Sequence, residues 1–185
     1  MSSTFYEGLE RHHMSTVTSV LFVCAGNICR SPMAEALFRH LATSESKLAN
    51  ISVGSAGTIA MNGNLPNADS VEALRCGCGL QMVTHRARRL SRHVTADLVL
   101  TMDRETARDA KAMCPGDHIE MLGDYAGTGE EVVDPYGASR RRHRDTLAQI
   151  ERLVPLAVAR LVDDAVSAPP EFVRHRELPP HTLTR

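Results

Sequence analysis

The chain alternates short apolar runs with longer segments in which apolar residues recur every three or four positions. Four runs of strand length are predicted to form β-strands, at residues 20–23, 51–53, 97–102 and 118–122, and the second ends at Gly54. Continuous apolar runs of this kind are typical of strands that a parallel sheet buries on both faces.

Amphipathic segments follow these runs and are predicted to be helices. The first begins at Ser31, the second and third span about 68–78 and 103–113, and the fourth runs from 139 to about 162. A glycine-punctuated loop at 123–138 precedes the last one. Strands that alternate with helices favour an open α/β sandwich, a parallel sheet covered on both faces, in which ligands bind beyond the carboxyl ends of the strands.

Length and composition fit one globular domain, with 185 residues, of which 43% are hydrophobic and 23% charged. We place this domain at residues 17–163. Residues 1–16 are polar and show no sustained period, so we expect a flexible leader, in which Met14 is an alternative translation start. Residues 164–185 contain four of the nine prolines and are expected to form a flexible tail.

Charge, hydropathy and cysteine content argue against several classes of protein. A net charge of −1 does not suit a nucleic-acid-binding polyelectrolyte, and no apolar run approaches the ~20 residues of a membrane span. Five cysteines, an odd number, are poor material for a disulfide framework and favour a reducing, cytoplasmic compartment. We expect a monomer or a weak dimer that binds neither nucleic acid nor membrane.

The loop between the first strand and the first helix carries the clearest chemistry. Its residues are Cys24, Ala25, Gly26, Asn27, Ile28, Cys29, Arg30 and Ser31. The helix dipole and converging backbone N–H groups favour an anion at such a place. A cysteine there is expected to be held as a thiolate, Arg30 offers donors that match phosphate oxygens, and Ser31 can hydrogen-bond to the sulfur. These parts describe a nucleophile that faces a phosphate-sized anion.

Spacing alone does not establish this interpretation. All of the 21 basic residues except Lys47 and Lys111 are arginine. In a chain so rich in arginine, about 0.5 pairs of a cysteine followed six positions later by an arginine, the spacing of Cys24 and Arg30, are expected by chance. The alternative is a buried cysteine near an unrelated arginine. The ordered context of strand, glycine, asparagine, arginine, serine and helix-starting proline favours a functional site instead.

Residues 23–35 resemble the motif of the low-molecular-weight protein tyrosine phosphatase family. The resemblance covers about residues 18–163 and includes further matches at 55–57, 85–88, 101–103 and 133–136. It implies a four-stranded parallel sheet with flanking helices, phosphorylated proteins as substrates, and a phosphatase that needs no metal or other cofactor.

The resemblance also implies the catalytic roles. Cys24 is the nucleophile that attacks phosphorus, and Asp134 is the general acid that protonates the leaving oxygen. Asp134 then activates the water that hydrolyses the phosphocysteine, while Arg30 and the loop amides hold the charge of the transition state. Without the family context, an aspartate before a proline in this loop would more often be a turn residue.

Supporting residues are implied in the same way. Asn27, Ser31 and His85 resemble the network that holds the loop, although His85 alone would more often be an ordinary surface or partly buried histidine. Cys29 lies within disulfide reach of Cys24 if the loop curls as expected. It is therefore a redox partner that could protect the nucleophile from peroxide, or else simply a small buried residue.

The side chain that this enzyme dephosphorylates is expected to be phosphotyrosine. Ile28 stands where protein arginine phosphatases have threonine, and an apolar side chain suits a phenyl ring. Tyr136 is expected to be the main aromatic contact, and Tyr125 is a weaker candidate that could equally belong to the core. The aromatic wall of many tyrosine phosphatases falls at residues 59–61, which are not aromatic here.

Other features favour the arginine-phosphatase branch, which stays the alternative. They are Asn62-Gly63, the run at 71–74, and residues 134–139, where Gly137 replaces a second aromatic.

Two further alternatives are less favoured. A thioredoxin-coupled arsenate reductase needs a relay of two more cysteines, but Cys76 and Cys78 are too close together and Cys114 is solitary. A non-catalytic phosphoprotein-binding module does not fit the intact catalytic residues. Two arginine clusters, at 86–92 and 140–144, are expected to be solvated faces.

Overall fold

Four apolar segments form one parallel sheet, where the sequence predicts strands. A computed structural model describes residues 17–94 and 96–167. The strands are β1 (Ser19–Cys24), β2 (Ser52–Gly57), β3 (Leu98–Thr101) and β4 (Ile119–Met121). They are hydrogen-bonded in the order β2-β1-β3-β4, and every neighbouring pair is parallel.

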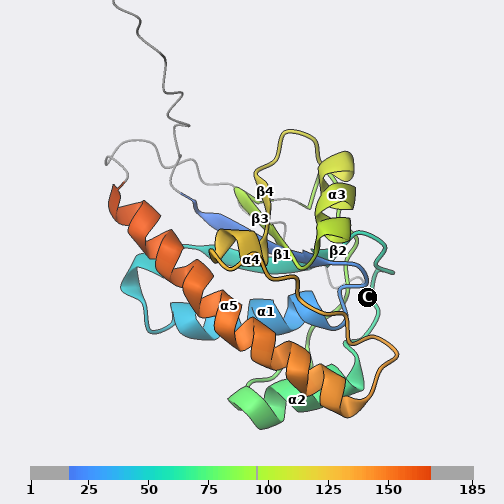
Figure 1. Cartoon of the computed structure of the whole chain (residues 1–185). Coiled ribbons are helices and arrows are strands. Elements are labelled where there is room, and N and C mark those ends of the chain that lie inside the picture. Colours follow the sequence, from blue (N-terminus) through green and yellow to red (C-terminus); the bar gives the residue numbers. More distant parts are fainter. Residues whose placement is uncertain (1–16, 95, 168–185) are drawn as a thin grey trace, which may run out of the picture.

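Helices cover both faces of this sheet, as Figure 1 shows. Helix α3 (Arg104–Met113) packs on one face. The opposite face is covered by α1 (Arg30–Ala42), α2 (Ala68–Cys78), α4 (Leu122–Tyr125), α5 (Arg140–Ser167) and the short 3₁₀ helix η1 (Ser46–Leu48). The predicted α/β sandwich is confirmed. Within residues 17–94 and 96–167, no helix combines the length and the apolar character that crossing a membrane requires.

Successive residues of β1 point to opposite faces of the sheet and join different cores. Val20 and Phe22 pack with α1 and α5, and the rings of Phe22 and Phe38 meet edge-to-face with their centroids 5.8 Å apart. Leu21 and Val23 join the core beneath α3. Because β1 is central and buried on both faces, its carboxyl end is a rigid platform for the loop that follows.

Two element boundaries differ from the predictions by more than one residue. β2 does not end at Gly54 but continues to Gly57, since its residues stay paired in register with β1 as far as Cys24. Helix α5 continues to Ser167, past its predicted end at about 162 and the predicted domain boundary at 163, although the last of its described residues that pack on the core are Leu161 and Val162. The predicted leader, with Met14, and residues 168–185 of the predicted tail lie outside the described residues.

Candidate active site

The loop between β1 and α1 surrounds the N-terminal end of that helix. Asn27 has a φ of 54°, the left-handed backbone expected of a loop that folds into a cradle. Cys29 precedes α1 and makes no side-chain hydrogen bond to the first turn. Helix N–H groups that no side chain caps, together with the positive end of the helix dipole, attract an anion.

Cys24 ends β1, and only 2% of it is exposed. The Asn27 backbone N–H donates a hydrogen bond to the Cys24 sulfur at 3.3 Å, and Ser31 Oγ lies 3.0 Å from the same sulfur. Ser31 Oγ accepts a hydrogen bond from Asn27 Nδ2 at 2.9 Å, and its own proton can be donated either to the sulfur or to the Ala56 carbonyl oxygen, which lies 3.3 Å away. Both groups can donate to a thiolate, the nucleophilic form of cysteine.

Asn27 connects the loop to two neighbouring segments. Its side-chain Nδ2 donates to Ser55 Oγ of β2 at 2.9 Å, and its Oδ1 accepts from the Arg88 backbone N–H at 2.9 Å. Its carbonyl oxygen accepts from His85 Nε2 at 2.8 Å. The predicted supporting residues Asn27, Ser31 and His85 therefore lie together, and Ser55 joins them although the sequence analysis gave it no role.

Arg30 begins α1, and only 3% of it is exposed. Its Nη1 is paired with Asp103 and donates to the Val132 carbonyl at 3.2 Å, and its Nη2 donates to Asp134 Oδ2 at 2.7 Å. Among the residues that the structure describes, Arg30 Nε is the one buried side-chain nitrogen or oxygen without a hydrogen-bond partner. A buried donor without a partner costs about 1–3 kcal/mol, which an acceptor on a ligand would relieve.

Asp103 is a site residue to which the sequence analysis assigned no role. It follows β3, caps α3 by accepting from the Thr106 N–H at 2.6 Å, and pairs with Arg30. Burial opposes its charge, but hydrogen bonds from Thr106 and Arg30 outweigh burial and lower the pKa of the Asp103 carboxyl. The available signal was topological, because neighbouring parallel strands end at the same edge of the sheet.

Asp134 reaches this edge from the segment between α4 and α5, 104 positions beyond Arg30 in the chain. Its Oδ2 accepts from Arg30, its Oδ1 accepts from the Tyr136 N–H at 3.1 Å, and 46% of its side chain is exposed. Tyr136 itself is 69% exposed. The structure therefore brings the predicted acid to the predicted nucleophile loop and leaves it accessible.

Three of the positions considered for substrate contact carry apolar side chains. Ile28 is half-buried, and Ile59 and Met61, at the position of the expected wall, are 65% and 70% exposed. Tyr125 is different, because it is only 1% exposed and lies in the core with the guanidinium of Arg160 4.2 Å from its ring centroid. Its candidacy as a substrate contact was wrong, since an amphipathic helix covers it.

Cys29 lies in a buried polar chain that the sequence analysis missed. Burial raises the pKa of the Cys29 thiol to about 11, although a hydrogen bond with Ser70 partly opposes the shift. Ser70 Oγ in turn lies 2.8 Å from Nδ1 of His143, and both residues are buried. No local motif signals this contact, because Ser70 and His143 belong to different helices, α2 and α5.

One arginine of the predicted solvated clusters is not on a solvated face. Arg88 is half-buried and donates from Nε to the Ser55 carbonyl at 2.7 Å. Burial lowers the pKa of its guanidinium. Arg88 therefore supports the end of β2 instead of forming part of a basic surface.

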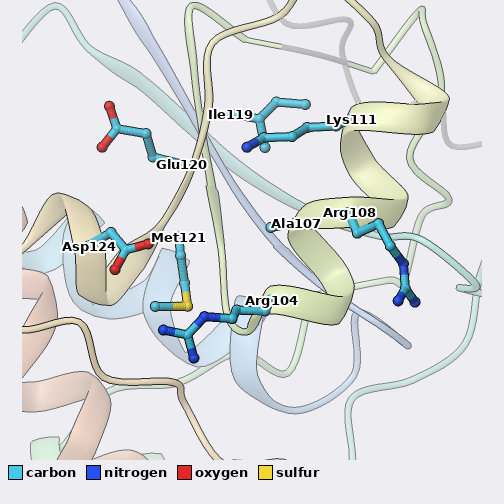
Figure 2. A pocket seen from close by; sticks show the side chains of 8 residues that line it. All are labelled: Arg104, Ala107, Arg108, Lys111, Ile119, Glu120, Met121 and Asp124. Atoms are coloured by element: carbon cyan, nitrogen blue, oxygen red, sulfur yellow. The ribbon is translucent and has the colours of Figure 1, made fainter.

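An open hollow of about 500 Å³ lies elsewhere, between α3, β4 and α4 (Figure 2). Its lining residues are Arg104, Ala107, Arg108, Lys111, Ile119, Glu120, Met121 and Asp124. None of them belongs to the predicted site, and the hollow lies along the edge strand β4, whereas the loop follows the central strand β1. The candidate site is defined by its polar groups and not by this hollow.

A buried thiol, a buried guanidinium and an accessible carboxylate thus meet where a parallel sheet gives way to a helix N-terminus. That combination supplies the nucleophile, the phosphate-binding cation and the acid that a cysteine-dependent phosphatase needs. The family model of low molecular weight phosphotyrosine protein phosphatases matches residues 19–166, and the chain belongs to this family of enzymes.

Individual relatives agree with this assignment. The chain is 34% identical over 151 residues to the probable low molecular weight protein-tyrosine-phosphatase EpsP of Ralstonia solanacearum, covering 78% of this chain and 97% of that protein. A low molecular weight protein tyrosine phosphatase from T. tengcongensis has a similar structure, with a TM-score of 0.70, 32% identity and coverage of 77% and 98%. The YwlE arginine phosphatase from Geobacillus stearothermophilus has a TM-score of 0.73 at 26% identity, covering 84% and 99%.

Proposed function

We propose that this protein hydrolyses phosphotyrosine in proteins, with Cys24 as nucleophile and Asp134 as general acid and base. The observation that carries the proposal is the arrangement of Arg30. Its guanidinium is buried beside the nucleophile loop, it holds Asp134 at 2.7 Å, and its Nε has no partner. A phosphate bound to the loop would supply the missing acceptor and would meet the nucleophile and the acid together.

The proposed reaction has two displacements. The Cys24 thiolate attacks phosphorus as the bond from phosphorus to the leaving oxygen breaks, and Asp134 gives that oxygen its proton. Asp134, now a carboxylate, takes a proton from water, whose oxygen attacks the phosphocysteine and releases phosphate and the Cys24 thiolate. Arg30 and the loop N–H groups stabilise the charge on the equatorial oxygens in both steps.

The other loop residues have supporting roles in this proposal. The backbone amides of Ala25, Gly26, Ile28 and Cys29 line the phosphate cradle with that of Asn27. Ser31 donates to the Cys24 thiolate, and His85 holds the loop through the Asn27 carbonyl at 2.8 Å. None of these groups changes its covalent bonds during the reaction.

Phosphotyrosine is favoured by the apolar and aromatic residues that we expect to contact the substrate. The half-buried Ile28 side chain would lie against the leaving group, and the exposed Tyr136, whose backbone N–H is bonded to the acid, offers an aromatic ring two residues further along. Phosphoarginine is the alternative, supported by the likeness to a solved arginine phosphatase and by Gly137, which leaves no second aromatic ring after Tyr136.

Two substitutions test the mechanism. Cys24→Ser is expected to abolish turnover of an aryl phosphate, and Asp134→Asn to reduce kcat by about 10²–10⁴-fold, the usual contribution of a positioned acid. Arg142→Ala, a change at an exposed arginine of α5, is the control and should leave kcat unchanged. Full activity of the Cys24→Ser protein would contradict the mechanism.

A comparison of peptide substrates tests the specificity. Wild-type protein is expected to have a higher kcat/KM on a phosphotyrosine peptide than on the matched phosphoarginine peptide. Ile28→Thr should shift the ratio towards phosphoarginine, because the threonine hydroxyl can orient a guanidinium. A wild-type preference for phosphoarginine would refute the substrate choice and leave the mechanism intact.

The remaining proposals concern regulation and setting. We propose that peroxide converts Cys24 to a sulfenic acid and that Cys29 then displaces hydroxide from it, giving a reversible disulfide. A cytoplasmic location suits an enzyme with a thiol nucleophile and five free cysteines. We further propose a monomer or weak dimer that binds phosphorylated proteins and neither nucleic acid nor membrane.

A further inference from the structure

Both backbone polar groups of Val133, the residue before the proposed acid, are bound by side chains of α5. The Val133 N–H donates to Gln149 Oε1 at 3.0 Å. The hydroxyl of Thr146 donates to the Val133 carbonyl at 3.0 Å, and Thr146 is fully buried. These two bonds hold the peptide groups on both sides of Val133, and the second of those peptide groups leads directly into Asp134.

The segment that carries the acid lies between α4 and α5 and forms neither helix nor strand. The Asp134 carboxylate is held by Arg30 and by the Tyr136 N–H. A phosphate in the cradle would compete for Arg30, so this contact weakens when the acid is needed. The anchoring of the backbone at Val133 persists, because phosphate does not compete for it.

Helix α5 is itself fixed relative to the nucleophile loop. It packs against α1, which begins with Arg30, and against α2. Its His143 is hydrogen-bonded to Ser70 of α2 at 2.8 Å, and the N–H of Asn67, which caps α2, donates to the Ile28 carbonyl at 2.8 Å. One rigid group of helices therefore holds both the loop and the segment that ends at the acid.

We propose that Thr146 and Gln149 are positioning residues for Asp134, an inference that rests on the proposed function. A general acid must lie about 2.6–3.2 Å from the oxygen that it protonates. A displacement of about 1 Å can cost about 10²-fold in rate, so two hydrogen bonds that fix the adjoining peptide groups bear directly on catalysis. Neither side chain is assigned contact with the substrate.

The test compares leaving groups. Thr146→Val keeps the shape of the side chain and removes the hydroxyl, and we expect kcat/KM on phenyl phosphate, whose leaving group needs a proton, to fall about tenfold. On an aryl phosphate with a strongly acidic phenol the loss should be less than about twofold, since that leaving group needs little help. Gln149→Leu should show the same selectivity, and Thr146→Ser should restore activity.

Thr18→Val is the matched control. Thr18 is half-buried, and its hydroxyl donates to Asp97 Oδ2 at 2.7 Å beside the first residue of β1, whereas the nucleophile loop follows the last residue of that strand. This variant should leave both rates within about twofold of wild type. Thermal unfolding would show that each variant is folded at the assay temperature.

Combining these substitutions with Asp134→Asn distinguishes the positioning role of Thr146 from the proposed catalytic role of Asp134. In the Asp134→Asn protein, Thr146→Val should cause no further loss, because the acid that it positions is already absent. Equal losses on both leaving groups, or a further loss in the Asp134→Asn background, would overturn the positioning role. If Asp134→Asn alone left kcat/KM on phenyl phosphate unchanged, the proposed function itself would fail.

Discussion

Arg30 carries a positive charge in a place where water cannot solvate it, and two carboxylates balance that charge in different ways. Asp103 is only 19% exposed and also caps α3, so its contact with Arg30 is a fixed part of the fold. Asp134 is 46% exposed and lies on a segment without regular structure. The first carboxylate therefore orients the guanidinium, whereas the second is accessible, as the proposed role of Asp134 as general acid requires.

Asp103→Asn separates the ion pair from the helix cap, since asparagine is an equally good N-cap. We expect a loss of about 1.5–3 kcal/mol in the free energy of unfolding near neutral pH, because a charged hydrogen-bond partner of Arg30 is removed. The pKa of Asp103 is lowered in the folded protein, so the stabilisation is present above the unfolded pKa and is lost as pH falls through the folded pKa. Urea unfolding of the wild-type and Asp103→Asn proteins between pH 7 and pH 3 measures how the difference in their free energies of unfolding depends on pH. A difference between them that grew with acidification would contradict the assignment.

Cys29 should make closure of the proposed disulfide strongly dependent on pH. The attacking group must be a thiolate, and burial raises the pKa of Cys29 to about 11, so only a small fraction is ionised at neutral pH. After a peroxide pulse, the rate of closure should rise roughly tenfold per pH unit between 7 and 10, as followed by mass spectrometry of trapped samples. Ser70→Ala removes a hydrogen bond that lowers this pKa and should slow closure. A closure rate independent of pH would exclude Cys29 as the attacking group.

The sequence predicted the type and order of the four strands and the four longer helices, and the ends of α2 at Cys78 and of α3 at Met113, but not the ends of β2 and α5. β2 contains Ser52 and Val53 of the predicted run at 51–53, and the pairing with β1 extends the strand through Gly54 to Gly57. Those added residues are small, so hydrophobic pattern could not mark them as a strand. Their strand structure comes from pairing with β1 as far as Cys24.

Gly57 shows why small residues are required at the end of β2. A Cβ at this position would lie 2.4 Å from the Ala25 carbonyl oxygen and 2.8 Å from the Asn27 nitrogen, both in the backbone of the nucleophile loop. We expect Gly57→Ala to displace this loop and lower kcat/KM on an aryl phosphate by about 10²-fold or more. Gly63→Ala is the control, because a Cβ there meets no atom within 4 Å, so only the strain of its positive φ is expected. Equal activities of the two variants would show that the loop tolerates movement.

At the scale of the whole molecule, the site is assembled from segments that are far apart in the chain. The nucleophile loop could be predicted because its chemistry lies within eight consecutive residues, 24–31, between a strand and a helix. Asp134 was found only through the family resemblance. The contacts of Arg30 with Asp103, and of Ser70 with His143, depend on how helices and strands pack, and no local pattern encodes that packing.

Because these segments come from most of the fold, an anion bound in the loop should stabilise the whole domain. A ligand that binds only the folded state at 100 times its Kd adds about 2.7 kcal/mol, or about 5–10 °C in Tm for a domain of this size. At about 100 times its Kd, inorganic phosphate is expected to raise Tm by this amount relative to chloride at equal ionic strength. The physical reason is that phosphate supplies the acceptor that Arg30 Nε lacks. The shift should vanish in Arg30→Ala and persist in Arg142→Ala, which changes an exposed arginine. An equal shift in both variants would mean that phosphate acts on the general surface charge, and the unpaired Nε would then have no part in binding.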